Sequence, residues 1–193
     1  MSNTSATGGY LTLTSLPVTD RDLSRLVHDV LAGVTGLNAE LVRPAWQVNA
    51  PIRPLLDVLW CAYSIVNRTT EAGTAWQQWQ SVTGSQLQRV ENFDVVASFY
   101  GPDCQTYAGI LRDGLELSQN REQLALLAVT YAYADQIVHV PELVNDRWYD
   151  RADIMLHFRR TIKNTYAILN LTNASGNYTT SAGLSGSWTT QEL

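Results

Sequence analysis

The sequence predicts an α+β fold, in which a small mixed or antiparallel sheet packs against helices and both termini are loose. Residues 20–31 and 104–115 carry apolar side chains three or four positions apart, a spacing typical of amphipathic helices. Residues 57–67 and 90–99 carry apolar side chains in the alternating pattern of strands. Helices and strands mixed in this order indicate a sheet with helices packed on it.

The first predicted helix begins at Asp20 and ends near Leu31. The Asp20 side chain can accept hydrogen bonds from the free N–H groups of the first turn, and Gly33 and Gly36 end the helix. The three prolines within residues 44–54 forbid a regular helix and predict an extended loop after it.

The second predicted helix has Pro102 in its first turn and Asp103 beside it, where a carboxylate suits the helix dipole. A short helix at residues 120–127 and a strand at residues 129–133 follow. These elements place Leu111 in the middle of the apolar helical stripe.

Alternation returns at Trp148, and the pattern predicts a strand with Trp148 and residues 152, 154, 156 and 158 facing inward. A second strand at residues 165–171 is expected to pair with it through a turn at Lys163 and Asn164. These two strands would form an antiparallel pair in the sheet.

The predicted organisation has three parts: a flexible arm at residues 1–14, one α+β domain at 15–172 and a flexible tail at 173–193. Both ends are rich in Ser, Thr and Gly. Trp76 and Trp79 lie in a polar stretch and are expected to pack onto the edge of the domain rather than to bind a ligand.

The bulk composition limits the classes of function. The net charge of −5 argues against a protein that grips nucleic acid through its phosphates. The first residues lack a signal-peptide pattern, and no apolar run approaches the roughly 20 residues that span a membrane, so no membrane partner is predicted. Cys61 and Cys104 are expected to be buried free thiols, with a disulfide as the alternative.

No catalytic motif is recognisable, and no pair of the three histidines has the spacing of a helical metal site. We therefore predict no enzyme, no metal and no cofactor. The strongest enzyme-like group is the set of carboxylates Asp146, Asp150 and Asp153, which could bind a cation or act as acid and base. Arg147 and Arg151 interleave with them, which is more typical of ion pairs between subunits.

Six phrases of the chain, in their order, resemble the neck or tail terminator proteins of tailed bacteriophages. The similarity covers roughly residues 41–171, and its last phrase is the most specific. The segment between residues 67 and 87 offers no matching phrase. The phrases are residues 42–47, 57–65, 98–102, 111–115, 119–122 and 140–148.

The resemblance implies a ring, commonly of six copies, between the head-side connector and the tail tube, with a hairpin that extends toward the next ring. Such a ring stops tube polymerisation and gives the capsid a docking surface, without enzymatic activity. The implied partners are copies of itself, the tail tube protein, the head-side connector or neck protein, and sheath protein if the tail contracts. DNA only passes through the channel. The implied location is the virion neck, with the host cytoplasm as the site of assembly.

A ring of identical copies needs two unlike faces on each subunit. Charged residues at element ends can supply these faces, and Trp148 beside Arg147 is typical of an interface anchor. The predicted interface residues are Arg112, Asp113, Arg121, Glu142, Asp146, Arg147, Trp148 and Arg151.

Three other functions stay open at this point. A head-side tail-completion protein or connector adaptor would occupy the other side of the same joint. A small cation-dependent hydrolase would use the three carboxylates named above. A single-stranded nucleic-acid module would use the tryptophans, although the chain lacks a basic groove.

Overall fold

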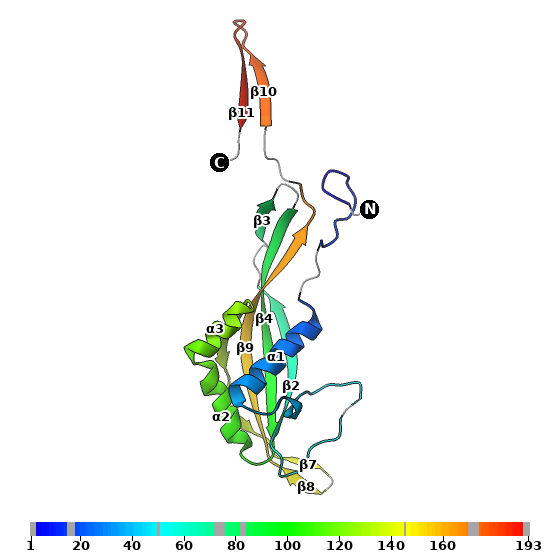
Figure 1. Cartoon of the computed structure of the whole chain (residues 1–193), viewed down its shortest axis with the longest axis vertical. Helices are drawn as coiled ribbons and strands as arrows, with labels where there is room; N and C mark the ends of the chain where they lie inside the picture. Colours follow the sequence, from blue (N-terminus) through cyan, green and yellow to red (C-terminus); the bar gives the residue numbers. More distant parts are fainter. Residues whose placement is uncertain are drawn as a thin grey trace. The chain divides into compact units, whose positions relative to one another are not determined.

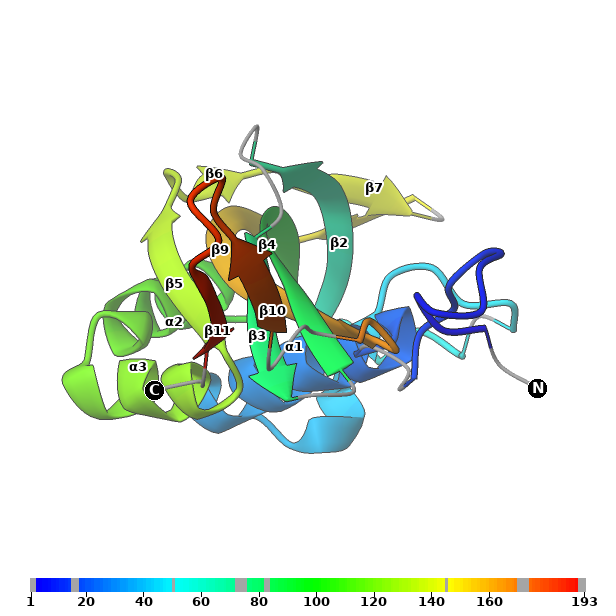
Figure 2. The same cartoon turned by 90° about the horizontal axis from the view of Figure 1, so that it is seen from above.

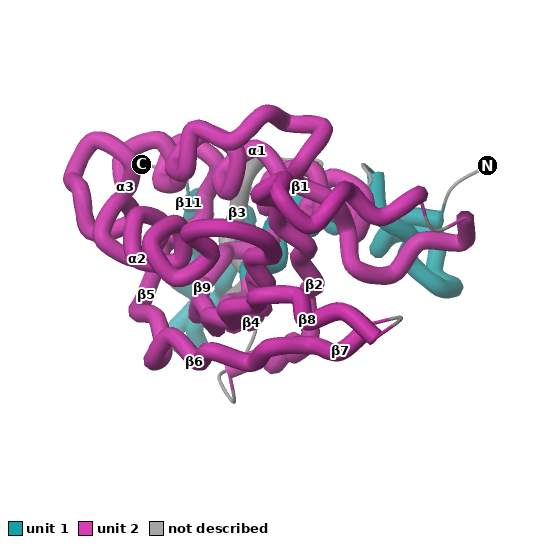
Figure 3. Tube along the Cα trace, turned by 90° about the horizontal axis from the view of Figure 1, so that it is seen from below, with its two compact units in different colours: residues 1–17, 74–88, 163–193 teal, residues 18–73, 89–162 magenta. Residues whose placement is uncertain are grey.

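The computed structural model of the chain describes residues 3–14, 18–49, 51–71, 76–81, 84–144, 146–169 and 174–190, with only the backbone described for 76–81. The chain splits into two compact units, which are coloured separately in Figure 3. Unit 1 comprises Met1–Pro17, Thr74–Gln88 and Lys163–Leu193, and unit 2 comprises Val18–Gly73 and Arg89–Ile162. The predicted division into two arms and one domain at 15–172 stays a prediction.

Three helices and a mixed sheet form unit 2, which confirms the predicted α+β class (Figure 1). The helices are α1 (Asp20–Thr35), α2 (Cys104–Leu115) and α3 (Ser118–Leu126), with a short 3₁₀ turn at Ala39–Leu41. The strands are β1 (Val42–Pro44), β2 (Trp60–Thr70), β4 (Gly84–Tyr100), β5 (Val129–Ala134), β6 (Val138–His139), β7 (Glu142–Val144), β8 (Arg147–Tyr149) and β9 (Arg151–Tyr166), of which β4 and β9 continue into unit 1.

The strands of the main sheet follow the order β1-β2-β4-β9-β5, and β6 also pairs with β9. Strand β1 runs parallel to β2, whereas β2 and β4, and also β5 and β9, are antiparallel. Strands β7 and β8 form a separate antiparallel hairpin. Figure 2 shows the three helices on one side of the sheet.

The core of unit 2 lies between the helices and this covered face of the sheet. The predicted helical stripe is confirmed, because Cys104, Ala108, Leu111 and Leu115 are all buried against the sheet. The inward set of β9 is confirmed for its even-numbered residues from 152 to 158. Burial of these apolar side chains is the main source of stability in such a layer.

Helix α1 is longer than predicted and starts differently. Thr19, not Asp20, is the cap: its hydroxyl accepts a hydrogen bond from the Asp22 N–H at 3.3 Å, and the Asp22 carboxylate accepts one from the Thr19 N–H at 3.1 Å. The side-chain hydrogen bond from Thr19 lowers the pKa of Asp22. Gly33 lies inside the helix, and Gly36 ends it with a φ of 71°.

The connection from β4 to α2 is tighter than the sequence predicts. Gly101 has a φ of 94°, and a Cβ there would lie 2.6 Å from the Val58 carbonyl oxygen, so only glycine fits. Asp103 has a φ of 61° and precedes the first helical residue, Cys104. Pro102 lies outside the helix, contrary to the prediction, because it is flanked by two residues with positive φ and the helix begins only at Cys104.

The predicted strand pair after Trp148 is wrong in two respects. Strand β8 ends at Tyr149, and Trp148 is 68% exposed because it belongs to the β7–β8 hairpin rather than to the covered sheet. Strand β9 then runs without a turn through Lys163 and Asn164. Neither residue supplies the positive φ of a tight turn, and the flanking Thr and Ile residues favour an extended chain.

Unit 1 contains short strand pairs. Strand β3 (Trp76–Ser81) pairs with the first residues of β4, and a bridge joins Leu13 to Tyr166. Strands β10 (Ala174–Thr179) and β11 (Ser185–Thr190) form an antiparallel hairpin where the sequence predicts no regular structure. The predicted packing of the Trp76 and Trp79 side chains lies outside the described residues.

Both cysteines are buried and free, which confirms the prediction of two buried thiols over a disulfide. Burial raises the pKa of the Cys61 thiol far above its ordinary value. Of the helices that the structure describes, none has the length and apolar character to cross a membrane.

Candidate subunit interface

Two neighbouring segments of unit 2 expose large apolar side chains to solvent. One is the loop of residues 45–57 and the other is the β7–β8 hairpin; we call them together the Trp46–Trp148 surface. Large apolar side chains that are exposed on neighbouring segments are typical of a protein interface. The exposed residues are Trp46, Val48, Ile52 and Leu55 of the loop and Leu143 and Trp148 of the hairpin.

Arg53 joins the loop to the hairpin. Its guanidinium lies 3.4 Å from a Glu142 carboxylate oxygen of β7. The same group lies over the rings of Tyr100 and Tyr149, at 5.5 and 5.4 Å from their centroids. Because an arginine fork can pair and stack at once, this one side chain holds three elements together.

Glu142 also connects the hairpin to the main sheet. Its carboxylate lies 3.7 Å from the Arg151 guanidinium of β9. Arg151 donates two hydrogen bonds of 2.7 Å to the Asp153 carboxylate, which raise the pKa of Arg151. A bidentate pair of this kind fixes the orientation of both groups.

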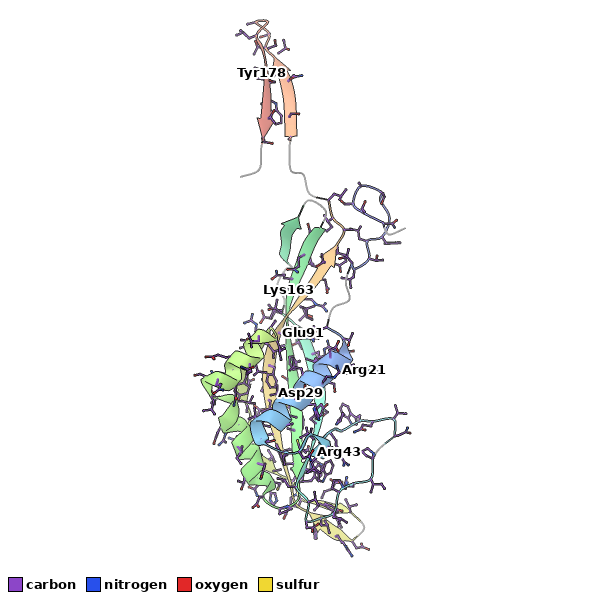
Figure 4. All side chains as sticks on the ribbon, in the orientation of Figure 1. Arg21, Asp29, Arg43, Glu91, Lys163 and Tyr178 are labelled. Carbon is purple, nitrogen blue, oxygen red and sulfur yellow. The ribbon has the colours of Figure 1, made fainter. Side chains whose placement is uncertain are left out.

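A stacked aromatic pair lies under these charges. The rings of Trp60 and Tyr100 are 4.4 Å apart and nearly parallel, at 9°. Both rings line a pocket of about 190 Å³, together with Arg43 and Arg53. Arg43, labelled in Figure 4, donates to the carbonyl oxygens of Glu40 and Ile52 at 2.8 and 3.0 Å and so anchors the loop.

The structure brings five of the eight predicted interface residues to this end of unit 2. Glu142 and Arg151 form an ion pair within the chain, so their charges are already paired. They hold the hairpin of the Trp46–Trp148 surface against the main sheet. Asp146 has a φ of 59° and precedes β8, and the exposed residues Arg147 and Trp148 follow it on the hairpin.

The other three predicted residues lie on the helices. Arg112 of α2 pairs with its neighbour Asp113, with 3.1 Å between Nε and Oδ1. Arg121 of α3 pairs with Glu116 and lies over the Tyr131 ring. The partners that the described part of the chain gives to Arg112 and Arg121 lie on α2, β5 and the residue after α2, and none belongs to the Trp46–Trp148 surface.

The three carboxylates considered for catalysis are not gathered into one site. Asp153 is held by Arg151, and Asp150 faces His139 at 3.5 Å. Asp146 lies in the turn before β8. Within the described ranges, no group of three His, Cys, Asp or Glu side chains is placed to hold a metal ion.

Sequence reasoning missed the loop side of this surface and its anchor, Arg53. A signal was present, because Trp46, Val48, Ile52 and Leu55 are large apolar residues in a proline-rich segment. Such a segment has no regular face on which to bury them, so their exposure could have been predicted.

The Trp46–Trp148 surface is apolar and exposed, and ion pairs hold its two segments in place. Such a surface is typical of a protein that functions by binding other proteins. The family model described as phage neck terminator protein matches residues 21–182, and the chain therefore belongs to this family. The family confirms the suspected resemblance. It makes the chain a structural protein of the phage neck, located in the tail and neck region of the virion, where it contacts other tail and neck components. No curated protein matches the chain.

Proposed function

We propose that the protein forms a ring at the phage neck, with six copies, which ends the tail tube and joins the tail to the head-side connector. The observation that carries this proposal is the Trp46–Trp148 surface on a member of the neck terminator family. A monomer in water gains nothing from six exposed large apolar groups, whereas a subunit buries them.

A second, unlike surface is needed for head-to-tail closure of a ring. A groove of about 390 Å³ between α1 and α3 supports this requirement, because Leu26, Val30, Leu124 and Leu127 are among its lining residues. Helices α2 and α3, which contribute to the groove, also carry Arg112, Asp113 and Arg121, and we propose them as interface residues of this face.

The proposed partners are further copies, the tail tube protein, the head-side connector or neck protein, and sheath protein if the tail contracts. DNA passes through the channel without a binding site, which the acidic balance of the chain supports. The proposed role has no catalytic step, metal or cofactor. Assembly takes place in the host cytoplasm.

The main alternative is a head-side tail-completion protein or connector adaptor. The two proposals differ in the particle that first acquires the protein. Tails assembled without heads should carry labelled protein at their head-proximal end if it is a terminator. Label found on isolated heads and absent from such tails would favour the adaptor.

A further inference from the structure

Charge is divided unevenly between the two units. The chain has 13 basic and 18 acidic side chains, and only Lys163 and Glu192 fall in the three segments of unit 1. Ion pairs can therefore guide contacts of unit 2, but they cannot guide contacts of most of unit 1. Association through unit 1 therefore relies on uncharged groups, such as backbone hydrogen bonds, polar side chains and apolar packing.

The β10–β11 hairpin of unit 1 has one aromatic face. Trp188 lies across Gly176, where a Cβ would be 2.8 Å from the indole nitrogen. Tyr178, labelled in Figure 4, lies across Gly186, where a Cβ would be 2.6 Å from the hydroxyl oxygen. Each ring thus covers the glycine directly opposite it, which fixes the register of the hairpin.

The other face of the hairpin consists of small polar residues. The Thr180 N–H donates to the Leu184 carbonyl at 2.7 Å and closes the turn. Because hydrogen-bonded and non-hydrogen-bonded pairs alternate in an antiparallel ladder, the next pair, Thr179 and Ser185, directs its backbone groups outward. The same alternation gives each outer edge three residues with outward N–H and C=O groups: Ser175, Asn177 and Thr179 on β10, and Ser185, Ser187 and Thr189 on β11.

Both outer edges lack the features that normally protect an edge strand. Lysine, proline and inward-pointing charge are the usual devices against edge-to-edge pairing, and residues 174–190 contain no proline and no charged residue. A two-stranded hairpin is also only marginally stable alone in water. Among the described strands, only β10 and β11 belong to this sheet. Its geometry therefore suits a further strand on each side.

We propose that the hairpins of neighbouring copies pair edge to edge, β10 of one copy with β11 of the next, and so form a closed ring of strands. This inference rests on the ring proposed above. A second copy is the fitting partner because every copy carries both unlike edges, so head-to-tail pairing leaves none unpaired. One different partner would cover one edge and leave the other exposed.

The test uses a proline on an outer edge of the full-length protein. Asn177→Pro removes one outward N–H of β10 and is compatible with an edge strand. It should weaken self-association by roughly twofold to tenfold, as expected for one lost hydrogen bond. The matched control, Asn177→Ala, keeps the N–H and should associate like the wild type in sedimentation velocity runs.

Complementation then distinguishes head-to-tail pairing from other arrangements. Ser187→Pro impairs the β11 edge instead, so every hairpin contact between copies of one proline variant is weakened. An equal mixture of the two variants retains one good edge of each kind, so sedimentation velocity should show tighter association in the mixture than in either variant alone. A mixture that associates no more tightly than either variant alone would contradict head-to-tail pairing.

The outcomes separate this inference from the ring itself. If Asn177→Pro and the wild type assemble equally well, the proposed edge pairing is wrong. The proposed ring would then depend on the contact surfaces of unit 2 alone. If the wild-type chain does not associate at any concentration, alone or with tail tube protein, the ring is wrong and the hairpin pairing fails with it. Unchanged urea unfolding of unit 2 in the proline variants confirms that their fold is intact.

Discussion

Glu91 is a buried carboxylate of unit 2 that pairs with two arginines. It is 5% exposed, and its carboxylate lies 3.1 Å from the Arg68 guanidinium and 2.8 Å from that of Arg160 (Glu91 is labelled in Figure 4). Arg160 is buried as well and lies over the Phe93 ring, and Arg68 also reaches Asp20 at the start of α1. Removing the carboxylate charge would leave two arginines facing a neutral group in a largely dry site.

Glu91→Gln should therefore lower the free energy of unfolding by about 3–5 kcal/mol, the usual loss when a buried pair is broken. Glu71→Gln is the matched control, because Glu71 also pairs with an arginine, Arg159 at 2.8 Å, but in an exposed position. The control should lose at most about 1 kcal/mol. Urea unfolding at pH 7 measures both. Equal losses would mean that the burial of Glu91 is unimportant.

Leu111 tests the core at the same scale. It is fully buried in the middle of the α2 stripe, so Leu111→Ala should cost roughly 2–5 kcal/mol by deleting packed methyl groups. Ile110, on the same helix, is 41% exposed, and Ile110→Ala should cost clearly less. A loss of less than about 0.5 kcal/mol for Leu111→Ala, the size expected of a surface substitution, would place this side chain outside the core.

The Cys61 thiol gives the protein a dependence on alkaline pH. Burial raises its pKa well above the ordinary value of 9.0, so the unfolded chain loses this proton at a lower pH than the folded one. The contribution of this thiol to the free energy of unfolding is fully present well below pH 9.0. Above pH 9.0 the free energy of unfolding falls by about 1.4 kcal/mol per pH unit. Cys61→Ala removes this titration, so urea unfolding between pH 8 and 10 should show a shallower decline for the variant. Parallel curves for variant and wild type would contradict the burial effect.

At the scale of elements, the β7–β8 hairpin is expected to act in assembly and not in folding. Arg147 and Trp148 are exposed and contribute nothing to the core of unit 2. Arg147→Ala and Trp148→Ala should each change the free energy of unfolding by no more than about 0.5 kcal/mol. Both should lower the yield of complete particles in complementation, because they remove an anchor of the proposed interface.

Arg89→Ala is the control for this prediction, since Arg89 is an exposed arginine of β4 outside the Trp46–Trp148 surface. It should leave particle yield unchanged. A normal yield with both hairpin variants would remove the hairpin from the interface.

Elements whose apolar faces meet the core could be predicted from the sequence. Apolar side chains recur at regular spacing in these elements, because one face of each has to be buried. The elements are α1, α2, β2, β4 and β9. The separation of β8 from β9 and the β10–β11 hairpin were missed. The first arises because a turn in which Asp146 has a positive φ pairs β8 with β7 in a separate hairpin. The second depends on rings that cover glycines of the opposite strand. Neither feature produces a period along the chain.

The candidate site was predictable only in part for a similar reason. The charged residues within 140–148 lie at the end of unit 2 that carries the Trp46–Trp148 surface, and their role in an interface stays a prediction. The sequence did not show that Glu142 and Arg151 pair with each other. Arg53 lies 89 positions before Glu142, and only the fold brings the two together. Charge patterns along a sequence locate candidate surfaces, whereas pairing across the fold decides which charges remain available.

For the whole molecule, the two units have different means of association. Unit 2 combines exposed apolar groups with nearly all of the charge, and unit 1 offers uncharged strand edges. Salt weakens contacts between charged groups, such as those of unit 2. It has much less effect on backbone hydrogen bonds between strands. In the proposed ring, such a division would keep the contacts made by the two units distinct.

The most direct test of the central claim, that copies of this protein assemble with one another, is its mass in solution by light scattering, alone and with tail tube protein. We predict a discrete species of six times the 21.5 kDa chain mass. A mass that stays at that of one chain under both conditions and at every concentration would contradict the account.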